Sequence, residues 1–256
     1  MKDIQGEEDR RGKIINKVGV RKINCLINHK TYREWAEVSA YISLPDFERG
    51  CHMSRFVEVF EYPTTIRLDN MTELLKHYLD KLCTVHKAKE SFIRLKLHYP
   101  YSQVSPEANR TSTRKIPLEL EGEKRGDTYV FYFKVVLYVT SLCPCSKEIS
   151  EFGAHNQRTM IETRCQLQHN IDFDEFLDCI NLGSAPIIEL LKRVDEKAVT
   201  EEAYENAKFC EDIARDVSIA IDKFEGVVNY SIVVESKESI HDHNALAIID
   251  HFKFDY

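Results

Sequence analysis

The sequence predicts an α+β protein in which antiparallel sheets are backed by helices. Some segments alternate apolar and polar residues with period two, as strands do, and others repeat apolar residues at helical spacing. Read in order, these segments give strand, strand, helix, helix, strand, strand, and the same order then occurs a second time. We therefore predict two ββααββ units, residues 1–122 and residues 123–256.

The first predicted unit begins with two extended segments, residues 13–28 and 31–44, which end at Pro45 and are typical of a hairpin. The remaining segments of this unit are, in order, a short helix over 52–62, a helix capped by Asn70, an alternating strand over 92–99, a polar loop over 105–115 and a strand over 116–120.

The second predicted unit begins with residues 128–140, whose almost wholly apolar composition indicates a strand buried on both faces. Its further segments are a strand over 159–168, a helix from Asp172 to about Asn181, the longest helix over 201–224, and strands over 227–234 and 246–254. Glu211 is expected near the middle of that longest helix, off its apolar stripe.

Composition excludes several classes of partner and location. Apolar residues make up 43% and charged residues 30% of the chain, the net charge is −7 and the pI is about 5.8. An acidic protein of this kind is a poor ligand for a nucleic-acid polymer or an anionic membrane. The charged first thirteen residues contain no signal-peptide core, and no apolar run reaches the roughly 18 residues of a membrane helix. We therefore expect a cytoplasmic protein, with most of its eight cysteines as buried free thiols.

The segment SLCPCSKEISEFGAHNQR, residues 141–158, carries the strongest chemical signal. It places Cys143, Cys145 and His155 within thirteen positions, directly after the most apolar run of the chain. Pro144 pushes Cys143 toward extended geometry, which puts both thiols in a turn at the exit of a strand. Thiolate and imidazole are ligands that soft or borderline divalent metals prefer. Two small buried thiols, or a redox pair with an unrelated histidine, are the alternatives that spacing leaves open.

Carboxylates and imidazoles elsewhere extend this candidate site. Asp195 and Glu196 could supply a carboxylate ligand, although acidic residues at this place also complement a helix N-terminus, which is the commoner role. His241 and His243 are two residues apart and point the same way if the backbone is extended, as in a metal or acid–base pair or in an ordinary polar loop.

Phosphate-binding motifs are few. His52 and Arg55 lie one helical turn apart, where they could meet a phosphate, although such a pair alone is weak. The sequence contains no P-loop, no dinucleotide-binding glycine motif and no nucleophile elbow.

Taken together, these motifs resemble the GTP cyclohydrolase I family, in its prokaryotic type IB branch. The matching pieces are HMSRF at 52–56, SLCPCSK at 141–147, GAHNQR at 153–158, DE…VTE…AY…N between 195 and 206, ED at 211–212 and E…S.H.H.A at 235–245. Cys51 departs from the pattern, in which a small hydroxyl residue is expected before HMSR.

The resemblance implies tandem tunnelling-fold (T-fold) modules in each subunit of a homotetramer, with active sites where subunits meet. It implies hydrolysis of GTP to 7,8-dihydroneopterin triphosphate and formate, the entry to folate and pterin synthesis. Two alternatives remain. An archaeal-type relative would release a cyclic phosphate, and a non-catalytic T-fold protein would hold a structural metal. The nitrile reductase of the same fold fits less well, since its cysteine would not need His155 and Glu196 as partners.

Site residues follow from the resemblance position by position. Cys143, His155 and Glu196 would hold one divalent metal ion per site, zinc, manganese or iron(II), with Cys145 beside them as a fourth ligand or catalytic thiol. His241 and His243 would transfer protons, since histidine has the side-chain pKa nearest neutrality. The implied substrate contacts are Glu211 as guanine anchor, Glu238 as a second site residue, and Arg55, Lys147, Arg158 or Lys197 at the triphosphate.

Overall fold

The computed structural model describes residues 3–30 and 32–252, and these divide into two compact units. One unit, here called unit 1, comprises the residues up to His98, Leu118–Phe133 and Gln166–Asn170. The other, unit 2, comprises Tyr99–Pro117, Lys134–Cys165 and the residues from Ile171 onward. Each unit is therefore assembled from several separate stretches of the chain. The boundary between two units at residue 122 stays a prediction.

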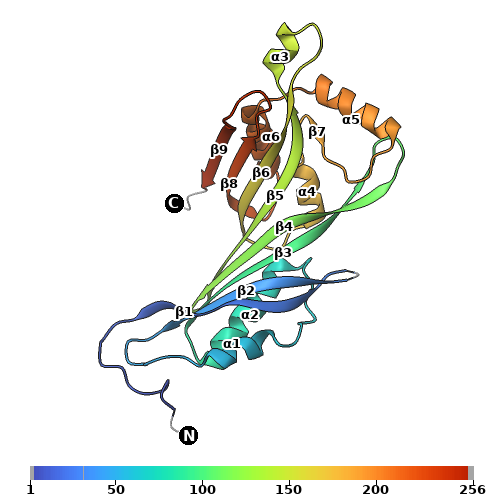
Figure 1. The fold of residues 1–256 in the computed structure, drawn as a ribbon. Coiled ribbons are helices and arrows are strands. Elements are labelled where there is room, and N and C mark those ends of the chain that lie inside the picture. Colours follow the sequence, from blue (N-terminus) through green and yellow to red (C-terminus); the bar gives the residue numbers. More distant parts are fainter. Residues whose placement is uncertain (1–2, 31, 253–256) are drawn as a thin grey trace. The chain divides into compact units, whose positions relative to one another are not determined.

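The strands form one hydrogen-bonded series, in the order β1-β2-β3-β4-β5-β6-β8-β9, with β7 paired to β5 (Figure 1). Their bounds are β1 Ile15–Asn28, β2 Arg33–Leu44, β3 Glu90–Val104, β4 Thr111–Arg125, β5 Thr128–Leu142, β6 Asn156–Leu167, β7 Ala185–Pro186, β8 Val227–Ser236 and β9 Ala245–Phe252. The pairs β1/β2, β2/β3, β5/β7 and β8/β9 are antiparallel. The predicted α+β class is confirmed, but the strands form one large sheet and not the separate antiparallel sheets that were predicted.

Two helices cover the β1–β2 hairpin in unit 1. Helix α1 (Met53–Phe60) packs on β1 and on α2 (Met71–His86), which in turn packs on β2 (Figure 1). Their apolar stripes, including Phe56, Tyr78 and Leu79, are fully buried because they face the inward side chains of the strands. Both helices and the hairpin were predicted from sequence, and all three are confirmed.

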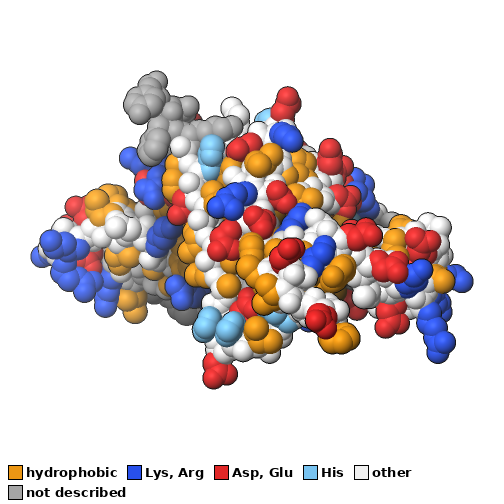
Figure 2. Space-filling model, turned by 90° about the horizontal axis from the view of Figure 1, so that it is seen from above, with side chains coloured by type: hydrophobic (Ala, Val, Ile, Leu, Met, Phe, Trp, Pro, Cys, Tyr) orange, Lys and Arg blue, Asp and Glu red, His pale blue; other side chains and the backbone are white. Residues whose placement is uncertain are grey.

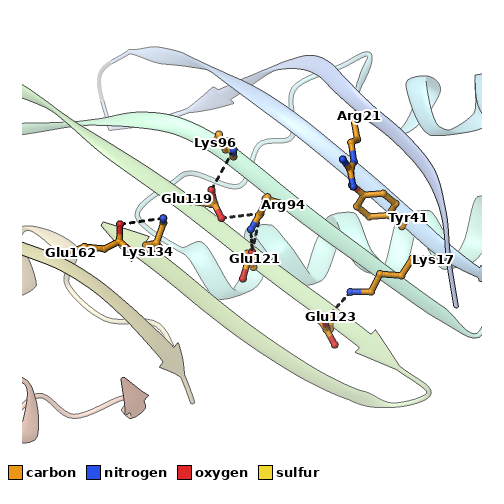
Figure 3. A network of polar contacts seen from close by, with 10 residues as sticks. All are labelled: Lys17, Arg21, Tyr41, Arg94, Lys96, Glu119, Glu121, Glu123, Lys134 and Glu162. Carbon is orange, nitrogen blue, oxygen red and sulfur yellow. Dashed lines mark hydrogen bonds and ion pairs between the residues drawn. The ribbon is translucent and has the colours of Figure 1, made fainter. Parts of the chain in front are cut away.

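The other face of the strands in unit 1 is charged. On β3 the apolar Ile93 and Leu95 are buried, so the alternation of the strand turns Arg94 outward. Arg94 forms ion pairs with Glu119 at 2.8 Å and Glu121 at 2.7 Å on β4 (Figure 3). These exposed pairs contribute little stability, but they keep the uncovered face hydrated.

Unit 2 is built around β8 and β9, on which α6 (Cys210–Asp222) packs, with α4 (Phe173–Ile180) against α6 (Figure 1). Asp172 caps α4 as predicted, since its carboxylate accepts the Glu175 N–H at 3.1 Å. Two further helices, α3 (Pro144–Ile149) and α5 (Arg193–Glu205), carry Cys145, Lys147 and Glu196 among the predicted site residues (Figure 1).

The long helix predicted over residues 201–224 is wrong, because the chain forms α5, a four-residue break and α6. The break has structural partners that compete with helical hydrogen bonds. The side chain of Asn206 donates to the carbonyls of Gly183 and Ser184, each at 3.2 Å, and the Lys208 N–H donates to the carbonyl of Leu142 at 3.1 Å. Long-range contacts of this kind override helical periodicity.

Two smaller predictions also need correction. The polar loop expected over 105–115 is shorter, because β4 already begins at Thr111 with its polar side chains facing outward. Strand β5 is buried on one face only, since buried residues alternate with partly exposed ones along it. The last predicted strand ends in β9 at Phe252, and its predicted residues 253 and 254 lie outside the described part of the chain.

The molecular surface is mixed in character. On the face drawn in Figure 2, acidic and basic side chains are interspersed with apolar ones. Within residues 3–30 and 32–252, the helices are all too short or too polar to span a membrane.

Candidate active site

The turn after β5 fixes the position of Cys143. The backbone of this residue is extended (φ −69°, ψ 115°), as predicted for a residue before proline, and Cys143 is the N-cap of α3. The turn continues as a short helix because Pro144 is its first residue, where a missing N–H costs nothing. The sulfur of Cys143 accepts the Ser146 N–H at 3.4 Å, whereas Cys145 is exposed on the helix.

His155 is brought to Cys143 by backbone hydrogen bonds. The Cys143 N–H donates to the carbonyl of His155 at 3.1 Å, and the His155 N–H donates to the Ser146 hydroxyl at 3.2 Å. The imidazole Nδ1 lies 3.1 Å from Oε1 of Gln157 and 3.5 Å from the Ser239 hydroxyl. The structure therefore joins two of the predicted metal ligands in one closed loop.

The two carboxylates at the start of α5 have different surroundings. Asp195 is completely buried, and its side chain accepts the backbone N–H groups of Lys192, Glu107 and Ala108 at 2.8, 3.0 and 2.9 Å. Desolvation raises the pKa of Asp195, but these hydrogen bonds outweigh it and bring the pKa to about 2. Asp195 is thus a helix anchor, the role that sequence favoured. Glu196 is exposed, so its carboxylate is accessible to a metal ion or a substrate.

The donor set fits a divalent metal in kind but is not gathered around one point. Within the described residues, no three His, Cys, Asp or Glu side chains are close enough to hold a metal ion. Cys143 and His155 are adjacent, and the Nδ1 contact of His155 leaves Nε2 available, as in metal-ligating histidines. Thiolate, imidazole and the carboxylate of Glu196 together suit zinc, iron(II) or manganese.

The loop between β8 and β9 carries the predicted proton-transfer residues. His241 and His243 are exposed, and their rings stack with centroids 4.9 Å apart at an angle of 10°. The same loop carries Glu238, and its Ser239 is the residue that approaches His155. The loop thus lies beside the Cys143–His155 turn within unit 2.

Glu211 lies in the first turn of α6 and not in the middle of a long helix as predicted. Its own backbone N–H and the thiol of Cys210, whose sulfur is 3.2 Å from the carboxylate, lower the pKa of Glu211. Burial, followed by the hydrogen bond to Glu211 and the negative charge of that carboxylate, raises the pKa of Cys210 to about 12. Glu211 is therefore an exposed, ionised hydrogen-bond acceptor at neutral pH.

The three basic candidates of unit 2 have intramolecular partners. Lys147 donates from Nζ to the carbonyl of Tyr204 at 2.5 Å, at the C-terminal end of α5, and lies 4.6 Å above the ring of that tyrosine. The Arg158 guanidinium lies 5.9 Å from the Tyr138 ring centroid. Lys197, one turn into α5, is 3.7 Å from Glu201 and is mostly exposed.

Arg55 belongs to unit 1, on α1, and lines a cavity of about 450 Å³ with His52 and His86. Burial, together with the positive charge of Arg55 and His52, lowers the pKa of His86 to about 4. The predicted pairing of His52 and Arg55 along one helix edge is thus present, with His86 as an additional imidazole.

Sequence reasoning missed a second cavity, of about 410 Å³, in unit 2. It is lined mostly by apolar side chains from residues 186–204 and by the loop residues 152–154 and Asn156. It also missed Gln157 as a partner of His155, although the i, i+2 spacing of the two residues was visible in GAHNQR.

Comparisons with known proteins give the family. Residues 1–247 match the family described as "Type I GTP cyclohydrolase folE2". "GTP cyclohydrolase FolE2" of Thermotoga maritima is 38% identical over 259 residues, 98% of this chain and 97% of the relative. The proteins of that name from Pseudothermotoga lettingae and Geobacter sulfurreducens are 37% and 38% identical, and the matches cover 97% and 99% of this chain and 98% and 99% of the relatives.

Among solved structures, the fold is similar to that of uricases. The uricase of Arthrobacter globiformis matches with a TM-score of 0.53 at 10% identity, over 93% of both chains. A hyper-thermostable AgUricase mutant matches with a TM-score of 0.57 at 11% identity, over 93% of this chain and 92% of the other. At such low identity, the likeness concerns the fold alone.

Proposed function

The chain belongs to the type I GTP cyclohydrolase FolE2 family, and from this premise we propose that it hydrolyses GTP to 7,8-dihydroneopterin triphosphate and formate, the first step of folate and pterin synthesis. The observation that carries the proposal is the match over residues 1–247, which contains every candidate site residue. These matches give the FolE2 family and do not carry the finer type IB label of the sequence resemblance.

The metal site is the part of the proposal that rests most on local geometry. Cys143, His155 and Glu196 would hold one divalent ion, with Cys145 next to them. When bound, the ion supplies Lewis acidity for the attack of water on C8 of guanine. The hydrogen bonds from Cys143 to His155 and from His155 to Ser146 support this assignment, because they hold the two donors in one turn. A single thiolate and a single carboxylate balance the charge of a divalent ion, which favours tolerance among metals.

Substrate recognition would use the remaining candidates. A carboxylate accepts both N–H groups on one edge of guanine, and Glu211 is ionised and exposed for that purpose, with Glu238 as a second site residue. His241 and His243 would move protons as formate leaves and the ribose rearranges, since both imidazoles are exposed beside the Cys143–His155 turn. Arg55, Lys147 and Arg158 are the proposed triphosphate contacts, and Lys147 would have to exchange its contact with Tyr204 for a phosphate oxygen.

The architecture of the assembly is also a proposal. The element order and the uricase-like fold support tandem T-fold modules with two ββααββ units. We propose a homotetramer with active sites at subunit interfaces, as the resemblance to the GTP cyclohydrolase I family implies. A cytoplasmic location is likewise part of the proposal.

The test is incubation of metal-stripped protein with GTP, with zinc, manganese or ferrous iron added back separately. The product is followed by the fluorescence of its oxidised pterin and resolved by chromatography before and after phosphatase treatment. The expected result is a metal-dependent linear triphosphate. A cyclic phosphate would instead place the chain with the archaeal type of enzyme.

A structural metal in a non-catalytic T-fold protein is the remaining alternative. A structural site is closed by four ligands, whereas the described residues of this chain gather no three. Metal bound at one equivalent per chain without turnover of GTP would contradict the proposed activity and support the structural role.

A further inference from the structure

The imidazole of His155 has a hydrogen-bond partner that no motif assigns. Its Nδ1 lies 3.1 Å from Oε1 of Gln157, and both side chains are half-buried. The Ser239 hydroxyl approaches the same nitrogen from the β8–β9 loop, but at 3.5 Å, the outer limit of a hydrogen bond. The shorter contact is therefore the one with Gln157.

The backbone fixes this pair in place. His155 immediately precedes β6, and Gln157 is the second residue of that strand, so the two side chains leave the extended chain on the same side. The backbone of His155 is held at its N–H by Ser146 and at its carbonyl by Cys143. With the backbone fixed, the remaining freedom of His155 is rotation of its ring, which the amide of Gln157 limits.

The tautomer of the ring depends on which end of the Gln157 amide faces it. With the amide oxygen toward Nδ1, as in the structure, Nδ1 carries the proton and Nε2 carries the lone pair, whereas an amide NH₂ group in that place would select the opposite tautomer. A histidine binds a metal through a nitrogen with a free lone pair, and partners of the other nitrogen tune its orientation and basicity.

We propose that Gln157 is a positioning residue, which orients His155 and holds it as the Nδ1–H tautomer with Nε2 free for a metal. This inference rests on the proposed function, because that function makes His155 a metal ligand. The inference differs from the proposed function because it assigns a role to Gln157, which is neither a proposed metal ligand nor a proposed substrate contact.

Four variants test the inference. Gln157→Leu removes the acceptor, Gln157→Glu retains one, and Gln168→Leu makes the same chemical change at an exposed glutamine just after β6. Gln157→Ala is added in case leucine disturbs the start of the strand, and thermal melting of each variant shows whether it is folded. The first measurement is ¹⁵N NMR of metal-free protein labelled at histidine, with the His155 signals identified from His155→Ala. The second is the affinity for zinc, measured in competition with a chelating dye.

For the wild-type protein and Gln168→Leu we expect the Nδ1–H tautomer and equal zinc affinity. Gln157→Leu and Gln157→Ala should give a mixture of tautomers and bind zinc about 10- to 100-fold more weakly, and Gln157→Glu should restore both properties. An unchanged tautomer and unchanged affinity in folded Gln157→Leu or Gln157→Ala would overturn the inference. If the wild-type protein itself binds no zinc, manganese or iron(II), the proposed metal site fails, and the tautomer comparison alone then decides the role of Gln157.

Discussion

The first turns of α5 and α6 are built alike but are held differently. In each turn an aspartate accepts the N–H of the residue that precedes the helix, Asp195 from Lys192 at 2.8 Å and Asp212 from Phe209 at 3.0 Å. Asp195 is completely buried and also bonds Glu107 and Ala108, whereas the side chain of Asp212 is 44% exposed. One turn is therefore tied to a distant hairpin, and the other is held locally.

In both turns the aspartate has a glutamate as its sequence neighbour, Glu196 in α5 and Glu211 in α6, and both glutamates are exposed. The aspartate accepts the hydrogen bond that caps the helix, so the neighbouring glutamate can bind a metal or a substrate without loss of the cap. The comparison teaches that, of two adjacent carboxylates, the one that does not cap the helix is the better candidate for function. It also predicts opposite consequences when either member of a pair is changed.

The largest expected effect is that of Glu196→Gln. Loss of the carboxylate ligand should lower metal affinity and reduce kcat/KM for GTP on the order of 10²- to 10³-fold, because the Lewis acid is worth several kcal/mol at the barrier. The melting temperature should not change, since Glu196 is exposed. Metal content and turnover are the measurements, with Glu202→Gln on the same helix as the matched control. Full activity with metal retained would remove Glu196 from the ligand set.

Glu211→Gln should act on substrate binding and leave the metal in place. Replacing the carboxylate by an amide removes one of two accepting oxygens from the guanine edge, which should raise KM for GTP on the order of 10- to 100-fold. Steady-state kinetics and metal analysis on the same sample separate this result from that of Glu196→Gln, and Glu225→Gln beyond the end of α6 is the control. An unchanged KM would mean that Glu211 is not the guanine anchor, and Glu238 would then be the candidate for that role.

Asp195→Asn should lower stability and leave the chemistry of the folded protein intact. The pKa of Asp195 lies at about 2, below its ordinary value of 3.8, so the ionised carboxylate stabilises the folded state above about pH 4. That contribution is lost as the pH falls from about 4 toward 2. Urea denaturation at pH 7 and at pH 3 should therefore show a difference between wild type and variant that shrinks at the lower pH. A stability difference independent of pH would mean that the loss does not come from the charge of Asp195, and the anchor role of the charge would be wrong.

The extent to which sequence predicted these regions depends on how local their causes are. The hairpin, the Asp172 cap of α4 and the extended Cys143 before Pro144 follow from neighbours in the chain, and all were predicted. The predicted cap at Asn70 is wrong, because that side chain makes no capping hydrogen bond. The break between α5 and α6 was missed because it is held by Leu142, Gly183 and Ser184, which are far away in sequence. Periodicity cannot reveal partners of that kind.

In the candidate site, too, contacts between near neighbours in the sequence were predicted and contacts between distant segments were not. The closeness of Cys143 and His155 was expected from the segment 141–158, in which only twelve positions separate them. The burial of Asp195 depends on the backbone of Glu107 and Ala108, so only its general role at a helix end was visible in sequence. The approach of Ser239 to His155 joins segments 84 residues apart, and no local pattern could predict it.

The smallest expected effect is that of Asp212→Asn, which completes the comparison of the two turns. The carboxylate of Asp212 caps α6 from the surface, so its loss should lower the free energy of unfolding by about 0.5 kcal/mol, the usual size of an exposed charge at a helix N-terminus. Kinetic constants for GTP should stay within the error of the wild-type values, because the neighbouring Glu211 is unchanged. Chemical denaturation of this variant beside Asp195→Asn at pH 7 measures the difference between the two anchors directly. Equal losses in the two variants would mean that the contacts of Asp195 with the distant hairpin add nothing to the capping of α5.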